Sequence, residues 1–122
     1  MLDNKHILVI EDDYDLLLML KKLFEINGFK VLTALTAKEG KKKFRKSVKK
    51  LNAIILDLSL PDQDGKFICK YIRKKSRQIP IIITTGSEDL MLKIELEKIG
   101  VDGFFIKPFD IAALLNSVNS AM

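Results

Sequence analysis

The 122-residue sequence contains one cysteine, Cys69, no tryptophan and three prolines. A single cysteine excludes an intramolecular disulfide and a cysteine-based zinc site. No apolar run exceeds the five residues from Leu16 to Leu20, whereas a membrane-spanning helix needs about 20. The apolar run Ile7–Ile10 is also too short for a signal peptide and leads directly into acidic residues. We therefore expect a soluble protein located in the cytoplasm.

The composition is typical of a globular domain, with 48% hydrophobic and 30% charged residues. The length suits one domain, and we expect residues 1–122 to form a single domain without an effector domain. The net charge of +5 is uneven, because residues 38–77 hold 14 Lys or Arg against 4 Asp or Glu, a balance of +10. Charge alone specifies no partner, so we interpret this basic stretch as solvated helices and do not expect this domain alone to bind nucleic acid.

Short apolar segments alternate with amphipathic stretches along the chain. The apolar segments predict strands over 6–10, 30–34, 53–57, 80–85 and 103–106. Between them, helices are predicted to about 27, over 37–50, to about 76, over 88–99 and from about 110. Asp13 or Asp15 can cap the first helix, and Thr36 with Glu39 forms a capping box for the second, whose inward face is predicted to extend to Leu51.

The predicted strands are apolar throughout rather than alternating. This pattern is typical of a parallel sheet that helices cover on both faces, an α/β architecture. Ligands of such open sheets bind beyond the carboxyl ends of the strands, so the residues at those ends are the candidates for function.

Chemically distinctive residues follow four of the five predicted strands. They are Glu11-Asp12-Asp13, Asp57, Thr85-Gly86-Ser87 and Lys107-Pro108. Clustered carboxylates raise one another's pKa unless a cation joins them, and Mg²⁺ prefers such oxygen ligands. A lysine beside the acids can pair with a carboxylate or with a phosphoryl oxygen. An aspartate can itself act as a nucleophile and form an acyl phosphate, which makes phosphoryl transfer the best-supported chemistry. Taken singly, however, each of these residues is more often a helix cap, a turn residue or a surface charge.

Four motifs in order identify a family. The sequence resembles the receiver domain of two-component response regulators over essentially its whole length, in the segments Ile7–Asp13, Ile54–Gly65, Pro80–Gly86 and Phe104–Phe109. The resemblance implies a doubly wound, flavodoxin-like (βα)5 fold whose five-stranded parallel sheet has the order 2-1-3-4-5.

The resemblance also implies roles for the acidic residues. Asp57 would be the phosphoacceptor, Asp12 a direct ligand of Mg²⁺ (or Mn²⁺), and Glu11 a ligand through water. Asp57 itself and the backbone carbonyl of Ser59 would complete the protein's part of the metal site. In the alternative register, the acidic pair would be Asp12 and Asp13.

The other positions implied by the resemblance concern switching. Thr85, rather than Thr84, matches the switch hydroxyl, and Lys107 matches the lysine that binds the phosphoryl group, with a cis peptide bond before Pro108. Phe104 matches the aromatic residue that turns inward on activation, on the surface of the fourth helix, the fifth strand and the fifth helix. Ser59 and Ser87 match the positions that tune hydrolysis. Because neither offers a carboxylate or amide to orient water, we expect slow hydrolysis.

The leading functional hypothesis is a signalling phosphoacceptor rather than an enzyme. A histidine kinase or histidine phosphotransfer protein would supply the phosphoryl group, and a downstream protein or a fused output domain would read the switch. The alternative is a receiver-like interaction module that never carries phosphate. A flavodoxin-type electron carrier is disfavoured because Glu11, Asp12 and Asp13 would repel the flavin phosphate, and an aspartyl hydrolase because Ser59 stands where a second acid is expected.

Overall fold

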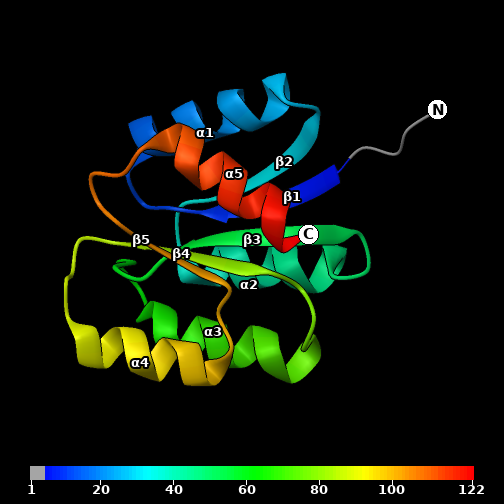
Figure 1. The fold of residues 1–122 in the computed structure, drawn as a ribbon. Coiled ribbons are helices and arrows are strands. Elements are labelled where there is room, and N and C mark those ends of the chain that lie inside the picture. The colour runs from blue at the N-terminus through cyan, green and yellow to red at the C-terminus, as the bar shows by residue number, and fades with distance from the viewer. Residues whose placement is uncertain (1–4) are drawn as a thin grey trace.

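The computed structural model, which describes residues 5–122, has five strands and five helices in strict alternation (Figure 1). The elements are β1 (Lys5–Ile10), α1 (Tyr14–Ile26), β2 (Phe29–Ala34), α2 (Ala37–Ser47), β3 (Leu51–Asp57), α3 (Gly65–Lys75), β4 (Ile81–Thr85), α4 (Leu90–Ile99), β5 (Gly103–Ile106) and α5 (Ile111–Ala121). All strand pairs are parallel, and the sheet order is β2-β1-β3-β4-β5. The predicted fold class and strand order are therefore confirmed.

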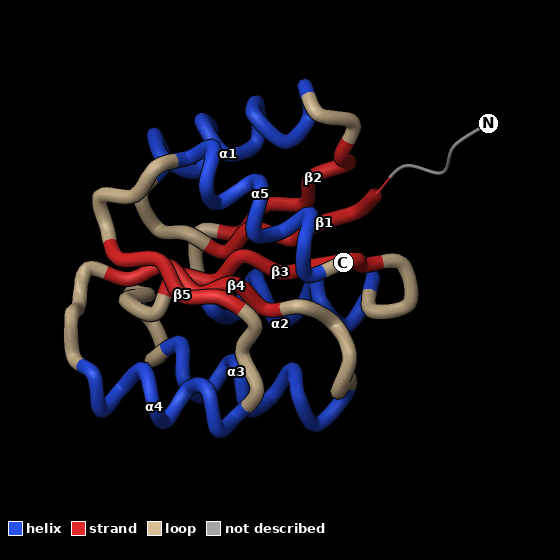
Figure 2. Tube along the Cα trace, viewed as in Figure 1, coloured by secondary structure: helices blue, strands red, loops and turns tan. Residues whose placement is uncertain are grey.

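The sheet lies between two helical layers (Figures 1 and 2). Helices α1 and α5 cover one face, where Ile7, Val9 and Ile55 pack beneath them. Helices α2, α3 and α4 cover the other face, over Leu8, Ile10 and their neighbours. Because successive side chains of a strand point to opposite faces, uninterrupted apolar strands supply both cores.

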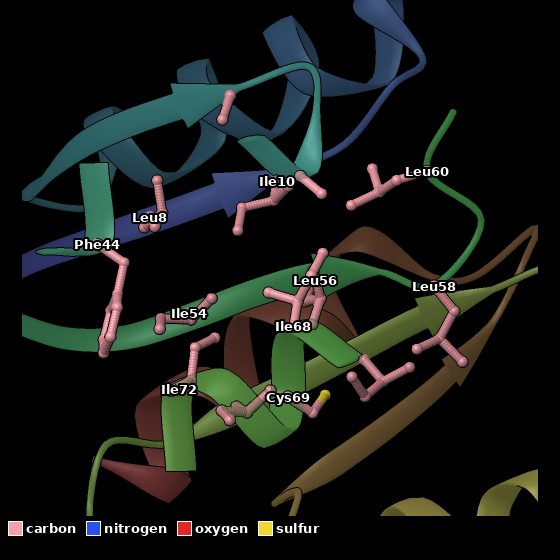
Figure 3. Packing of buried hydrophobic residues seen from close by; sticks show 14 of the residues in the cluster. Leu8, Ile10, Phe44, Ile54, Leu56, Leu58, Leu60, Ile68, Cys69 and Ile72 are labelled. Carbon is pink, nitrogen blue, oxygen red and sulfur yellow. The ribbon is translucent and has the colours of Figure 1, made fainter. Parts of the chain in front are cut away.

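A close view of the larger core shows how α2 and α3 share one sheet face (Figure 3). Phe44 of α2 and Ile68, Cys69 and Ile72 of α3 are buried there, as the sequence predicts for the inward faces of these helices. Most cations of the basic stretch, residues 38–77, are exposed on the outer side of this layer. Lys41 of α2 and Lys75 of α3 both lie over the ring of Tyr71.

Local capping sets where the helices begin. Asp13 caps α1 by accepting from the Leu16 N–H, and Thr36 caps α2 by accepting from the Glu39 N–H. The prediction for α4 was two residues too early. Ser87 Oγ accepts from the Asp89 N–H, and Asp89 itself caps the helix, which therefore begins at Leu90. The helix ends at Gly100, whose φ of 112° lies in the left-handed region that favours glycine.

The predicted end of α2 was also wrong. The helix stops at Ser47, and Leu51 is the first residue of β3, opposite His6 of β1. The sequence from 47 to 51 contains no glycine or proline to mark this end. Pairing with β1 therefore overrides a local pattern that is equally compatible with continued helix.

Arg73 of α3 contacts the residues that follow α4, and through Asp102 it is linked to the start of β4. Its Nε and Nη2 donate to the Gly100 carbonyl at 3.0 and 2.7 Å, and Nη2 also lies 3.2 Å from Asp102 Oδ2. The same Asp102 oxygen accepts from the Ile81 N–H.

Among the described residues, no helix is long and apolar enough to span a membrane.

Candidate functional site

Glu11 and Asp57 are side by side because their strands are neighbours in the sheet. Ile10, the last residue of β1, is the register partner of Leu56 in β3, so the next residues on both strands meet at the same edge. Both acids are buried, each only 1% exposed, whereas Asp12 is exposed. One carboxylate oxygen from each of Glu11, Asp12 and Asp57 lies within 4.8 Å of the others.

Lys107 supplies the positive charge of this cluster. Its Nζ lies 2.9 Å from Glu11 Oε1 and 3.3 Å from Asp57 Oδ2. The residue follows β5, and its N–H donates to the Thr85 carbonyl at 2.7 Å, which ties it to the end of β4. The peptide bond between Lys107 and Pro108 is cis, as predicted. The three strand ends thereby bring one ammonium group against two buried carboxylates.

Burial and hydrogen bonding together shift the pKa values of the two acids in opposite directions. Desolvation, reinforced by the hydrogen bond to Asp57, raises the pKa of Glu11 to about 7. For Asp57, desolvation acts in the same upward direction, but it is outweighed by hydrogen bonds from Glu11 and the Ser59 N–H and by the charge of Lys107, so its pKa is lowered. The two shifts have opposite directions, so Asp57 gives up its proton more readily than Glu11.

A tight loop after β3 holds the Asp57 side chain. The Ser59 N–H donates to Asp57 Oδ1 at 3.0 Å, while Ser59 itself is exposed. The loop closes through the Gly65 N–H, which donates to the Leu58 carbonyl at 3.0 Å. A Cβ at position 65 would lie 2.7 Å from Leu58 Cα, so this close approach requires glycine.

The two threonines of β4 face different surroundings. Thr85 Oγ1 accepts from the Ser87 N–H at 3.1 Å, which places the predicted switch hydroxyl and Ser87 together at the strand end. Thr84 lies opposite Asp57 in the β3–β4 register. Its Oγ1 is buried without a hydrogen-bond partner among the described residues.

Phe104 lies on β5 at the edge of the sheet and is partly buried. The ammonium of Lys93 from α4 lies 5.8 Å from the centre of its ring. Phe104 also lines a groove of about 240 Å³ between α4 and β5. The aromatic position singled out in the sequence therefore sits at the surface, next to α4.

The three acidic residues after β1 have two different roles. Glu11 and Asp12 belong to the cluster with Asp57, whereas Asp13 Oδ1 accepts from the Leu16 N–H and caps α1. Of the two registers considered from the sequence, the geometry favours Glu11 and Asp12.

The carboxylate cluster suits a hard cation. Two of its acids are buried, and Glu11 Oε1, which has no hydrogen bond within residues 5–122, lies 2.9 Å from Lys107 Nζ. Lys107 offsets part of the negative charge of the three acids, and a bound cation would offset more of it. Three carboxylate oxygens within 4.8 Å are oxygen ligands of the kind that Mg²⁺ and similar ions take.

Sequence reasoning missed Asp62, which lies in the loop after Asp57. Its carboxylate accepts from the Ala37 and Lys38 N–H groups at the start of α2, at 2.8 and 2.9 Å. An aspartate after a proline is typical of an ordinary turn. Nothing in the sequence marks partners 25 residues away.

Comparison with known sequences gives one family. The sequence model of the response regulator receiver domain matches residues 7–119. A probable transcriptional regulator, ycf27, from Cyanidium caldarium is 33% identical over 117 residues, which are 96% of this chain and 46% of the relative. The PhoP regulator of alkaline phosphatase synthesis from Bacillus subtilis is 33% identical over 106 residues, 87% of this chain and 43% of the relative. The chain thus spans about half the length of these relatives.

Solved structures agree with the sequence comparison. A receiver domain protein from Clostridium thermocellum superposes with a TM-score of 0.90 at 33% identity, covering 96% of this chain and 93% of that one. The non-phosphorylated receiver domain of HemR from Leptospira biflexa also has a TM-score of 0.90, at 27% identity, covering 97% and 94% of the two chains.

Proposed function

This chain belongs to the response regulator receiver domains of two-component systems, and from that premise we propose that Asp57 is its phosphoacceptor. The observation that carries the proposal is the state of the Asp57 side chain. It is buried and ionised, with the Ser59 N–H on Oδ1 and the Lys107 ammonium near Oδ2. A desolvated carboxylate held by fixed donors is suited to act as a nucleophile.

In the proposed reaction, a carboxylate oxygen of Asp57 forms a bond to the phosphorus of the donor. The bond from phosphorus to the donor's imidazole nitrogen breaks at the same time, and its electron pair leaves with that nitrogen. Positioning and charge stabilisation do most of the work in phosphoryl transfer. Lys107, which pairs with two carboxylates at rest, is placed to pair with a phosphoryl oxygen after transfer.

We propose that Asp12, Asp57 and the Ser59 carbonyl hold Mg²⁺ (or Mn²⁺), with Glu11 acting through water. The cation would supply charge neutralisation for the transferring phosphoryl oxygens. The fit rests on the three clustered carboxylates and on the buried Glu11 Oε1, which has no hydrogen bond within the described chain.

The proposed switch uses Thr85 and Phe104. Thr85 Oγ1 accepts from the Ser87 N–H in this structure, and a phosphoryl group on Asp57 would offer its hydroxyl a stronger, charged acceptor. Movement of Thr85 would free space for Phe104 to turn inward and so change the surface formed by α4, β5 and α5. Phe104 has no hydroxyl, so its contribution would be steric.

Hydrolysis of the acyl phosphate is proposed to be slow. Ser59 and Ser87 occupy the positions at which a carboxylate or amide would orient an attacking water. A half-life of the purified phosphoprotein well above seconds supports this part of the proposal, and one of seconds or less contradicts it.

We propose a histidine kinase or a histidine phosphotransfer protein as the donor and a cytoplasmic setting for the exchange. Residues 1–122 would act as one phosphoacceptor unit that controls a partner protein or a fused output domain. The two relatives named above are described as transcriptional regulators, which makes control of transcription a natural output to test.

Incubation with acetyl phosphate and Mg²⁺, followed by intact-mass measurement, tests the proposal. The expected result is the gain of one phosphoryl group, abolished by EDTA and by Asp57→Asn. If neither acetyl phosphate nor a phosphohistidine donor modifies the wild-type chain, the proposal is wrong. The phosphate-independent interaction module then becomes the better hypothesis.

A further inference from the structure

The loop that follows Asp57 is fastened to a different helix at its outer end. Asp62 Oδ1 accepts from the Ala37 N–H at 2.8 Å, and Oδ2 accepts from the Lys38 N–H at 2.9 Å. These are two of the amide groups that a helix N-terminus leaves without an intrahelical partner. A carboxylate there also meets the positive end of the helix dipole. Asp62 is exposed, and the two hydrogen bonds lower its pKa, which keeps it ionised at neutral pH.

Asp62 is not the only capping group at the start of α2. Thr36 Oγ1 accepts from the Glu39 N–H at 3.1 Å, and Glu39 Oε1 accepts from the Leu35 N–H at 3.1 Å. This local arrangement already satisfies two amide groups at the start of α2. The Asp62 bonds differ because they span 25 and 24 residues and link two segments of the chain.

Contacts within the loop connect its outer end to Asp57. Ser59 and Asp64 pair across it as an isolated antiparallel bridge, and the Gly65 N–H closes it on the Leu58 carbonyl. Leu58 and Leu60 are buried in the core beneath it, where Figure 3 shows both side chains among the labelled cluster. The loop therefore has two attachments: apolar packing on its inner side and Asp62 on its outer side.

We propose that Asp62 is a positioning residue for the phosphoacceptor. By fastening the loop to the start of α2, Asp62 keeps the Ser59 N–H on Asp57 Oδ1, and it keeps the Ser59 carbonyl in place for the cation. The consequence for cation binding rests on the function proposed above, whereas the effect on Ser59 does not. Without the two Asp62 hydrogen bonds, the loop would move around the buried Leu58 and Leu60. The hydrogen bond from the Ser59 N–H to Asp57 Oδ1 would then loosen.

Three variants separate this role from simple capping of α2. Asp62→Ala removes both acceptor oxygens, and Asp62→Asn retains one. Thr36→Ala is the matched control, since it removes an acceptor from the same helix terminus without touching the loop. Circular dichroism and thermal melting establish that each variant is folded.

The first readout is solvent exchange of the Ser59 amide, measured by NMR without added metal. We expect exchange to be at least about fivefold faster in Asp62→Ala, given the strength of hydrogen bonds to a charged group. Asp62→Asn should lie between this variant and wild type. Thr36→Ala should leave Ser59 exchange within about twofold of wild type, because its effect stays local to the helix end.

The second readout is Mg²⁺ affinity, measured by calorimetry without a phosphodonor. Loss of a group that orients a metal ligand typically weakens binding by tenfold or more, so we expect roughly tenfold weaker binding in Asp62→Ala and little change in Thr36→Ala.

The outcomes separate cleanly. Unchanged Ser59 exchange in both Asp62 variants overturns the proposal, and so does an equal increase in Thr36→Ala, which would show only weakening of α2. If Asp62→Ala fails to fold, Asp62→Asn gives the same comparison. If wild type binds no Mg²⁺, the metal part of the proposed function fails, while the exchange measurement still tests the tether.

Discussion

The ammonium of Lys107 lies 2.9 Å from Glu11 Oε1, although 96 residues separate the two in the sequence. Strands β3 and β4 lie between their strands in the sheet. Lys107 therefore reaches across the carboxyl edge and also contacts Asp57 of β3 at 3.3 Å. This arrangement makes the lysine the counter-ion of two buried acids in the resting protein.

Replacement of Lys107 by Met should destabilise the metal-free protein. The change leaves two buried carboxylates without their cation, and breaking a fully buried pair costs about 3–5 kcal/mol. Because a quarter of the Lys107 side chain is exposed, we expect a loss of about 2 kcal/mol at pH 8. Urea unfolding measures it.

Lys66→Met is the matched control for that measurement. Lys66 Nζ lies 2.8 Å from Glu95, but half of the Glu95 side chain is exposed. A surface pair of this kind contributes little to stability, so the loss should be much smaller than for Lys107→Met. Equal losses in the two variants would contradict the view that Lys107 neutralises buried charge.

Thr84→Val should stabilise the protein. Thr84 Oγ1 is buried without a hydrogen-bond partner in the described chain, and an unsatisfied polar group of this kind costs about 1–3 kcal/mol. Valine has nearly the same shape, so we expect a gain of about 1 kcal/mol in the free energy of unfolding. Thr85→Val should show no such gain, because Thr85 Oγ1 accepts from the Ser87 N–H.

Cys69 should make stability depend on pH in the alkaline range. Burial raises the pKa of its thiol from 9.0 to about 12, so the native thiol keeps its proton where the unfolded thiol loses it. Its contribution to stability is full below pH 9 and declines as the pH rises from 9 towards 12, by up to about 1.4 kcal/mol per pH unit.

The Cys69→Ala variant isolates this contribution. The difference in unfolding free energy between wild type and the variant should shrink as the pH rises above 9. Iodoacetamide should likewise react with native Cys69 far more slowly than with the denatured protein at pH 8.5. A native thiol that reacts at the denatured rate would contradict its burial.

Arg73→Lys should be destabilising despite the retained charge. The guanidinium donates to the Gly100 carbonyl through two nitrogens and to the Ser76 carbonyl through a third, a fork that an ammonium cannot reproduce. We expect a loss of about 2 kcal/mol in thermal or urea unfolding. Arg45→Lys, at an exposed site on α2, should change stability by no more than about 0.5 kcal/mol.

Much of the fold could be predicted from the sequence because its signals are local. The apolar strands and the caps at Asp13 and Thr36 act over a few residues, and both caps form the expected hydrogen bonds. Convergence of Glu11, Asp57 and Lys107 follows from topology, since the carboxyl ends of parallel strands share one edge. The end of α2 could not be predicted, because Leu51 is drawn into β3 by pairing with β1.

Side-chain contacts away from the strand ends were beyond sequence reasoning. The Asp62 carboxylate and the Arg73 guanidinium find partners 24 to 29 residues away, and an ordinary surface charge is the usual reading of either residue. Only the structure shows that Asp62 and Arg73 have such partners while neighbouring charged residues do not share them.

Locating the phosphoryl group tests the central claim most directly. The protein is phosphorylated with acetyl phosphate and Mg²⁺, the acyl phosphate is reduced with borohydride, and the peptides are sequenced by mass spectrometry. The account predicts homoserine in place of Asp57 and unchanged Asp12 and Asp13. Reduction at another acid, with Asp57 intact in a fully phosphorylated sample, would contradict it.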